Sequence, residues 1–263
     1  MTGPAELGPF LLLLAGVAGL LVGSFLNVLA HRLPRNESVV WPGSHCPACG
    51  APITALQNIP VLSWVALRGK CAVCRAPIAL RYPALELANA ALWIGVALKA
   101  RDWGDLLSGA FLASACLALL AIDAEFQILP DKITLTGIAV GIGLSFLSPS
   151  RTTVSAVLGA ALGAGGLFLV AFLYEKIAGH EGMGLGDVKM LGMIGAFLGP
   201  AGVLLTILLA SLSGSVVGIA LIASGTGTRK LRLPFGVFLA IGAVAAYFFG
   251  APLIARYREM WPK

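Results

Sequence analysis

The chain has 263 residues, of which 58% are hydrophobic and only 11% are charged, and its mean hydropathy is +0.92. Because about a quarter of the residues in soluble domains are charged, this composition excludes an ordinary soluble enzyme and indicates a protein whose main solvent is the lipid bilayer. The net charge of +6 does not indicate a nucleic-acid partner, since no basic stripe carries interleaved aromatic residues.

Long apolar runs predict an all-α polytopic membrane protein with about eight transmembrane helices. The first run, Phe10 to Ala30, lacks a basic segment before it, so we expect a retained span and not a cleaved signal peptide. Gly199-Pro200 interrupts a later run that is too long for one crossing and predicts a tight turn between two spans. The helices are expected near residues 8–30, 83–99, 105–122, 133–148, 154–175, 188–199, 201–223 and 234–255.

The distribution of Lys and Arg predicts the orientation in the membrane. With eight spans, one side receives the loops 31–82, 123–132, 175–187 and 224–233. With Lys189 at its edge, that side holds twelve of the 18 basic residues: Arg32, Arg35, Arg68, Lys70, Arg75, Arg81, Lys132, Lys176, Lys189, Arg229, Lys230 and Arg232. Because basic loops stay in the cytoplasm, we expect these loops to be cytoplasmic and both termini to be outside. Part of the positive charge would then face anionic lipid headgroups.

The first of these loops, residues 31–82, is the largest segment between predicted spans. Cys46-Pro-Ala-Cys49 and Cys71-Ala-Val-Cys74 are two C-x-x-C pairs separated by 21 residues, a spacing typical of four-thiolate zinc sites. We predict a small cytoplasmic zinc-ribbon-like domain in which Zn²⁺ is structural, because four thiolates leave no position for a catalytic water. The competing interpretation is a membrane thiol-disulfide oxidoreductase, which the expected reducing compartment disfavours.

Two aspartates lie at the ends of predicted spans. Asp123 closes the third span, and Asp187 follows alternating glycines in Gly182-Met-Gly-Leu-Gly-Asp187. A carboxylate at membrane depth needs water, a partner or a substrate, so each is a candidate functional residue. Asp187 could instead be a helix N-cap, and Asp123 an ordinary boundary residue. A proton-coupled transporter is a further alternative, disfavoured because no inverted repeat is evident.

The order and spacing of several motifs resemble the type IV prepilin leader peptidases, which also methylate the new amino terminus of their substrate. The resemblance runs through most of the chain. The motifs that carry it are Gly23-Ser-Phe-Leu-Asn-Val28 with Arg32-Leu-Pro34, the two C-x-x-C pairs enclosing Asn58-Ile-Pro60 and Ser63-Trp64, Leu67-Arg-Gly69, Arg81-Tyr-Pro83 with Glu86, Ile122-Asp123, Leu129-Pro-Asp131 and Gly184-Leu-Gly-Asp187.

This resemblance implies an aspartic protease of the G-x-G-D kind in the bacterial inner membrane, with Asp123 and Asp187 as the catalytic pair at the cytoplasmic face. Two neighbouring carboxylates share a proton, so that one acts as base and the other as acid. From their positions at a helix start and a helix end, we expect Asp187 to carry the charge and Asp123 the proton. We expect three parts, residues 1–30 as a first span, 31–82 as the zinc domain and 83–263 as the peptidase domain.

By the same resemblance, the substrates are prepilins of type IV pili or pseudopilins of type II secretion, and S-adenosylmethionine is the methyl donor. The chain has no Rossmann fingerprint for that donor, so the residues that transfer the methyl group stay unassigned. Nothing in the sequence indicates the oligomeric state.

Overall fold

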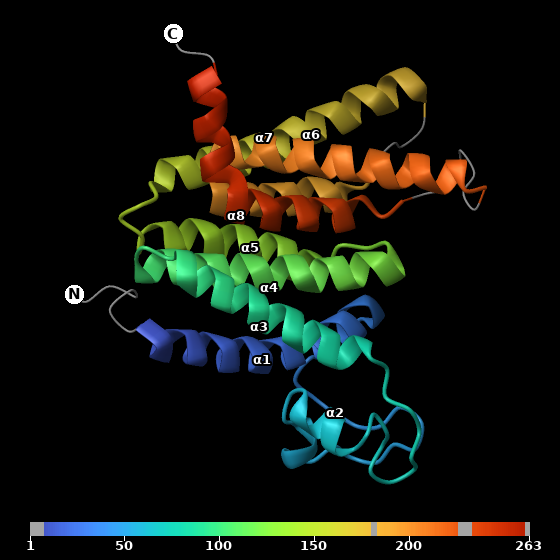
Figure 1. Ribbon diagram of the computed structural model, residues 1–263. Coiled ribbons are helices and arrows are strands. Elements are labelled where there is room, and N and C mark those ends of the chain that lie inside the picture. The colour runs from blue at the N-terminus through green and yellow to red at the C-terminus, as the bar shows by residue number, and fades with distance from the viewer. Residues whose placement is uncertain (1–7, 180–182, 226–232, 261–263) are drawn as a thin grey trace. The chain divides into compact units, whose positions relative to one another are not determined.

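The computed structural model describes residues 8–179, 183–225 and 233–260, and the long elements among them are all helices. The chain divides into two compact units, Met1–Arg101 and Asp102–Lys263, whose helices are labelled in Figure 1. The described residues contain two isolated β-bridges, His45 with Pro52 and Lys70 with Pro77, and no longer strand. The predicted all-α class is confirmed.

In the first unit, α1 (Gly8–Arg32) and α3 (Arg81–Lys99) lie side by side (Figure 1). Gly19 makes this close contact possible, because a Cβ at that position would lie 2.7 Å from the Cα of Ala90. The Asn89 side chain donates a hydrogen bond of 2.8 Å to the Gly19 carbonyl oxygen. In a bilayer the hydrophobic effect does not drive helices together. Small residues and interhelical hydrogen bonds of this kind hold them together instead.

The segment between α1 and α3 contains the short helices η2 (Leu33–Arg35), η3 (Leu56–Asn58) and α2 (Leu62–Ala66). It buries little apolar surface of its own: Val40, Trp41 and Leu56 are 82%, 78% and 78% exposed. Its best-packed feature is Trp64, whose ring lies against Gly69 and whose indole N–H donates to the Ile78 carbonyl oxygen at 3.1 Å. Such a segment needs a further source of folding free energy.

The second unit is built around α4 (Trp103–Phe126). Cys116, Leu119 and Ile122 on this helix are fully buried, and α4 packs against α5 (Asp131–Ser145) and α8 (Phe235–Met260). Cys116 is thus buried as a small apolar side chain. The core of this unit therefore surrounds the helix that carries Asp123.

The helices α6 (Thr153–Ala178) and α7 (Leu185–Ala223) form a glycine-mediated pair. A Cβ on Gly159 would lie 2.2 Å from the Gly195 carbonyl oxygen, a distance that no side chain tolerates. This close backbone packing fixes the first part of α7, and with it the residues that precede it.

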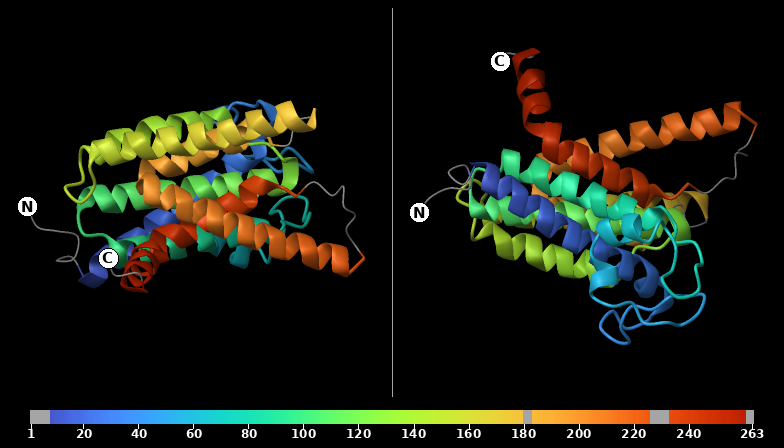
Figure 2. Two further views of the ribbon diagram at one scale, coloured as in Figure 1. Left: turned by 90° about the horizontal axis from the view of Figure 1, so that it is seen from above. Right: turned by 60° about the horizontal axis from the view of Figure 1, so that its bottom comes forward.

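The predicted interruption of α7 is confirmed. Gly199 has φ of 69° and breaks the helix directly before Pro200. Val203 then packs against Gly195, since a Cβ on that glycine would lie 2.9 Å from a Val203 methyl carbon. Positions eight residues apart in a straight helix are about 12 Å apart, so the chain turns back at Gly199, and the two parts of α7 are visible in Figure 2.

Five described helices are long and apolar enough to cross a membrane: Gly8–Arg35, Trp103–Phe126, Thr153–Ala178, Leu185–Ala223 and Phe235–Arg256. The expected count of eight spans stays a prediction, because α3, α5 and the separate parts of α7 are not counted among the five. The expected three-part division of the chain also stays a prediction.

Candidate active site and candidate metal centre

Asp123 lies in the last complete turn of α4 and is only 4% exposed. Its Oδ2 atom accepts a hydrogen bond of 3.1 Å from the Val237 amide, and the Gly236 amide donates to the same side chain. Both amides belong to the first turn of α8, where backbone N–H groups have no partner within the helix. The start of α8 therefore holds the carboxylate of Asp123 in one orientation.

Asp187 lies in the first turn of α7 and is half-buried. Its carboxylate lies over Gly184, since a Cβ on that glycine would be 3.8 Å from Asp187 Oδ2 with no heavy atom closer. The Asp187 amide donates to the Gly184 carbonyl oxygen at 3.2 Å. The Asp187 side chain interacts electrostatically with Asp123, so the structure brings together two acids that lie 64 positions apart in the chain.

Leu129, in the connection between α4 and α5, packs between the start of α7, which carries Asp187, and the start of α8, which binds Asp123. A Cβ on Gly186 would lie 3.0 Å from Leu129 Cβ, and a Cβ on Gly236 would lie 3.0 Å from Leu129 Cδ1. Gly186 is thus crowded, whereas a Cβ on Gly184 would meet only ordinary van der Waals contacts, at 3.8 Å or more. Gly182, the remaining glycine of the predicted motif, lies outside the described residues.

No described cation pairs with either acid. Lys189, two residues after Asp187, instead forms an ion pair of 2.8 Å with Asp131 at the start of α5. Within the described ranges, Asp123 and Asp187 interact with each other and with backbone groups. Two buried carboxylates without a cation cannot easily both ionise, so this arrangement suits a shared proton and a water molecule between them.

Sequence reasoning identified both acids but not Gly236 and Val237. The signal was weak: Pro234 precedes an apolar run, which indicates a helix start, but nothing in the sequence indicates that this helix meets the end of α4. The crowding at Gly236 is clearer, because a Cβ there would lie 2.8 Å from Asp123 Oδ2.

The four cysteines of the C-x-x-C pairs come together in the first unit. The sulfur atoms of Cys46, Cys49, Cys71 and Cys74 all lie within 4.8 Å of one another, and the Cys46 and Cys74 sulfurs are 3.8 Å apart. A tetrahedral zinc site with Zn–S bonds of about 2.3 Å places its sulfurs about 3.8 Å apart. The donor set and its spacing therefore fit Zn²⁺.

Backbone geometry also prepares this cluster for a cation. The amides of Cys74 and Val73 point at Cys71 and lower the pKa of its thiol to about 6. Gly50 and Arg75 each follow a C-x-x-C pair with positive φ, 70° and 61°, which turns the chain around the sulfurs. Thiolates are the form that binds metal, so the fold presents at least one ready ligand.

A further acid, Glu86, is buried in the first unit. Glu86 on α3 is 8% exposed, and its Oε2 atom accepts a hydrogen bond of 2.7 Å from the Val61 amide. Val61 has φ of 61°, which is rare for a β-branched residue. Glu86 thereby holds the corner of the chain at which α2 begins.

Comparisons with known proteins agree on one family. The family described as "Bacterial Peptidase A24 N-terminal domain" matches residues 17–100, and the "Type IV leader peptidase family" matches residues 110–219. A prepilin leader peptidase/N-methyltransferase of Burkholderia pseudomallei (strain 1026b) is 38% identical, covering 90% of this chain and 84% of its own length.

Proteins with the same printed name in other bacteria are similarly close. The Aeromonas hydrophila protein is 37% identical and covers 90% of both chains, and the Pseudomonas putida protein is 36% identical and covers 95% of both. No solved structure matches the chain significantly.

Proposed function

The chain belongs to the type IV leader peptidase family, and from this premise we propose that it cleaves the leader peptide from prepilins and methylates the new amino terminus. The similar proteins are named for both activities and align with nearly the whole chain. The observation that carries the peptidase activity is the pairing of Asp123 with Asp187 without a described cation. Substrates would be prepilins of type IV pili or pseudopilins of type II secretion.

We assign the charge to Asp123 and the shared proton to Asp187, the reverse of the assignment expected from helix ends alone. The reason is the contact with α8. Asp123 Oδ2 accepts backbone hydrogen bonds from Val237 and Gly236, and hydrogen bonds from N–H groups favour a carboxylate over a carboxylic acid. Asp187 accepts one such bond, from the Gly184 amide, whereas Asp123 accepts two.

In this scheme Asp123 takes a proton from the water molecule, and the water oxygen attacks the scissile carbonyl carbon. Asp187 donates its proton to the carbonyl oxygen. The tetrahedral intermediate collapses when the proton held by Asp123 moves to the leaving nitrogen and Asp187 recovers a proton from the intermediate. No covalent enzyme intermediate is needed.

The exposed backbone at Gly184, which carries no side chain, gives the substrate backbone a route to Asp187. Gly184 is exposed, and the next residue, Leu185, is 60% exposed. An extended leader segment could pass over this glycine because no side chain blocks it. The apolar helix of the prepilin would stay in the bilayer while its basic leader lies at the membrane surface.

The test is a reconstituted assay with the full chain in liposomes. A prepilin carrying a carboxyl-terminal tag is incubated with and without S-adenosylmethionine, which supplies the methyl group, and the amino terminus of the product is measured by mass spectrometry. Cleavage after the leader Gly in both samples, and a mass increase of one methyl group only with the donor, is the expected result. An uncleaved prepilin would contradict the peptidase activity, and an unmethylated product the second activity.

We further propose that Cys46, Cys49, Cys71 and Cys74 hold one structural Zn²⁺. The 3.8 Å separation of two of their sulfurs and the small apolar core of the segment support this. The purified protein should contain about one zinc per chain, lost in a Cys46→Ser/Cys71→Ser double variant. Cys116→Ala removes a buried thiol outside the cluster and should keep the zinc. Full zinc content in the double variant would exclude this site.

We propose the inner membrane as the location, with the zinc-ribbon-like segment and both acids facing the cytoplasm. The excess of Lys and Arg in the corresponding loops supports this orientation. Eight crossings, with α7 contributing two, are the arrangement that agrees with it.

A further inference from the structure

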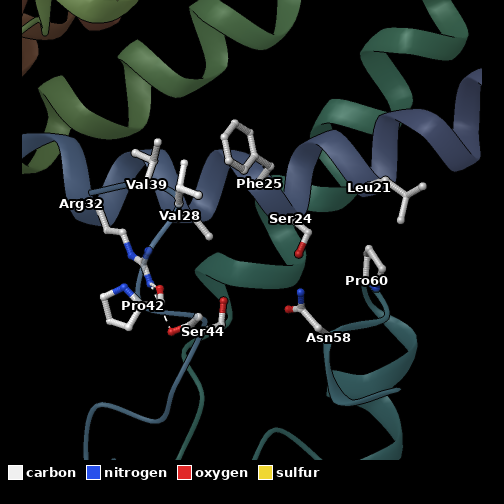
Figure 3. A pocket seen from close by; sticks show the side chains of 12 residues that line it. Leu21, Ser24, Phe25, Val28, Arg32, Val39, Pro42, Ser44, Asn58 and Pro60 are labelled. Carbon is white, nitrogen blue, oxygen red and sulfur yellow. Dashed lines mark hydrogen bonds between the residues drawn. The ribbon is translucent and has the colours of Figure 1, made fainter. Parts of the chain in front are cut away.

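The first unit contains a cavity of about 280 Å³, near the lower end of the volumes typical of small-molecule sites. One wall is a stripe of α1 formed by Leu21, Ser24, Phe25, Val28 and Arg32. The opposite wall comes from the segment Val39–Ser44 and from Asn58 and Pro60. Figure 3 shows side chains from both walls pointing into the space between them.

Arg32 gives this cavity a fixed positive charge. The residue is only 8% exposed, and its guanidinium donates to the carbonyl oxygens of Ser38 at 2.9 Å, Pro42 at 2.7 Å and Gly43 at 3.3 Å. No described carboxylate pairs with it. Because a guanidinium has five N–H donors, donors remain available for an anionic group of a ligand.

A buried carboxyl group lies on the other side of Ser24. The Ser24 hydroxyl bonds to the carboxylate of Glu86, which is almost fully buried. Ser24 and Arg32 are eight residues apart on α1, or about 12 Å along the helix. In Figure 3, Ser24 and Asn58 point toward each other across the cavity. The cavity thus offers a cation, neutral polar groups near a carboxylate, and an apolar wall with Phe25 and Val28.

We propose that this cavity binds S-adenosylmethionine, an inference that rests on the proposed methyl transfer. The ligand is amphipathic and carries a carboxylate, a cationic sulfonium, sugar hydroxyls and an aromatic base. Arg32 would bind the carboxylate, Ser24 and Asn58 the hydroxyls, and Glu86 would attract the sulfonium. Both candidate peptidase acids lie in the other unit, in or beside the segment matched by the leader peptidase family, so methyl transfer has no evident place there.

A phospholipid headgroup is the main competing occupant, because α1 also exposes Leu21 and Phe25. The lining favours the methyl donor. A phosphate is best held by several cations or free amides, whereas Arg32 is the one Lys or Arg in the cavity lining.

The experiment measures equilibrium binding of S-adenosylhomocysteine and S-adenosylmethionine to the full chain in nanodiscs by calorimetry. Val28→Phe fills the cavity and Arg32→Gln removes its charge, and each should weaken binding roughly tenfold or more. The matched control is Val17→Phe, which adds the same volume at a position on α1 that is 49% exposed and outside the cavity. The control should bind as wild type does.

Arg32→Gln could also loosen the segment whose carbonyl groups it holds, so zinc content is measured on every variant. If Arg32→Gln loses its zinc, the test of the cavity rests on Val28→Phe, which removes no hydrogen bond. Ultraviolet cross-linking of methyl-labelled donor provides a second readout and should label a peptide within residues 21–60. Labelling confined to α4–α8 would overturn the proposal.

The outcomes separate the two proposals. If the wild-type chain neither binds the donor nor methylates pilin, the proposed methyl transfer is wrong. If wild type binds and methylates while Val28→Phe binds equally well, methyl transfer stands and the cavity is not the donor site. Donor binding that is unchanged in Val28→Phe, together with loss of phosphatidylglycerol binding by that variant, would identify a lipid site and overturn the inference.

Discussion

The two ends of α4 both hold aspartates, in opposite electrostatic settings. At the start, Ser148 donates to Asp102 at 3.1 Å, Ser150 donates to Asp105 at 2.8 Å, and Arg151 attracts both acids. At the other end, Asp123 meets the amides that begin α8 and the carboxylate of Asp187. One end neutralises its acids, and the other places two acids together without a described cation.

We interpret this difference as that between a structural cluster and the proposed catalytic pair. Arg151 also donates to the Ser108 hydroxyl at 2.8 Å and to the Phe197 carbonyl oxygen, so it links α4 to the segment before α6 and to α7. At the opposite end the nearby cation, Lys189, is engaged by Asp131. An acid whose charge is satisfied stabilises the fold, whereas an acid that lacks a cation remains available for proton transfer.

The largest effect should come from Asp123→Asn and Asp187→Asn. Each change keeps the shape of the side chain but removes the group that exchanges protons, so cleavage of prepilin in liposomes should fall at least about a thousandfold. Glu125→Gln is the matched control, because this exposed acid lies in the same turn of α4 as Asp123. Normal cleavage by both Asn variants would show that the reactive end has been misidentified.

Gly236→Ala should have the next largest effect. The added Cβ would lie 2.8 Å from Asp123 Oδ2 and 3.0 Å from Leu129, so the carboxylate must move. A displacement of about 1 Å lowers catalytic rates about a hundredfold, and we expect a loss of ten- to a hundredfold in the cleavage rate at saturating prepilin.

Gly166→Ala on α6 is the control for this glycine, because nothing lies within 4 Å of a Cβ at that position. It should cleave as wild type does. If Gly236→Ala also retains the wild-type rate, contact with the start of α8 does not orient Asp123 in the active protein.

The two acids could be predicted from the sequence, whereas the groups that hold Asp123 could not, and the reason is physical. The sequence predicted Asp123 and Asp187 because a charged group in an apolar run is conspicuous, and it predicted the break at Gly199-Pro200 because both residues disfavour a continuous helix. The partners of Asp123 are backbone amides at Gly236 and Val237. Amides are present at almost every residue, so only the packing of α8 against α4 reveals which ones act.

The same limit applied to the first unit. The spacing of four cysteines predicted a metal centre, and the structure brings their sulfurs together. The cavity beside Arg32 was not predicted, because its walls come from α1 and from two separate parts of the following segment. Side chains that line a cavity without sharing a motif leave no local pattern in the sequence.

Arg151→Met should lower the stability of the fold more than the rate of prepilin cleavage. The change removes the cation that Asp102 and Asp105 face and leaves the hydroxyl of Ser108 without its donor. Loss of hydrogen bonds to a partly buried charged group destabilises by about 1–3 kcal/mol, so the midpoint of thermal unfolding in detergent should fall. Arg256→Met, an exposed position on α8, should unfold like wild type. Equal midpoints for the two variants would remove the structural role assigned to this end.

The smallest effect concerns Asp102, whose response to pH should distinguish a neutralised acid from a reactive one. Burial raises the pKa of Asp102, but hydrogen bonds from the Asp105 amide and from Ser150 and Ser148 outweigh burial and lower it. An acid with a lowered folded pKa stabilises the protein above its unfolded pKa of about 3.9, and this stabilisation disappears as pH falls through the folded value. Asp102→Asn keeps the cap on α4 and loses the charge, so it should be less stable than wild type by about 0.5–1 kcal/mol near neutral pH. Unfolding midpoints measured from pH 7 down to about pH 3 should converge; a difference that widens on acidification would mean that Asp102 is not held as a carboxylate.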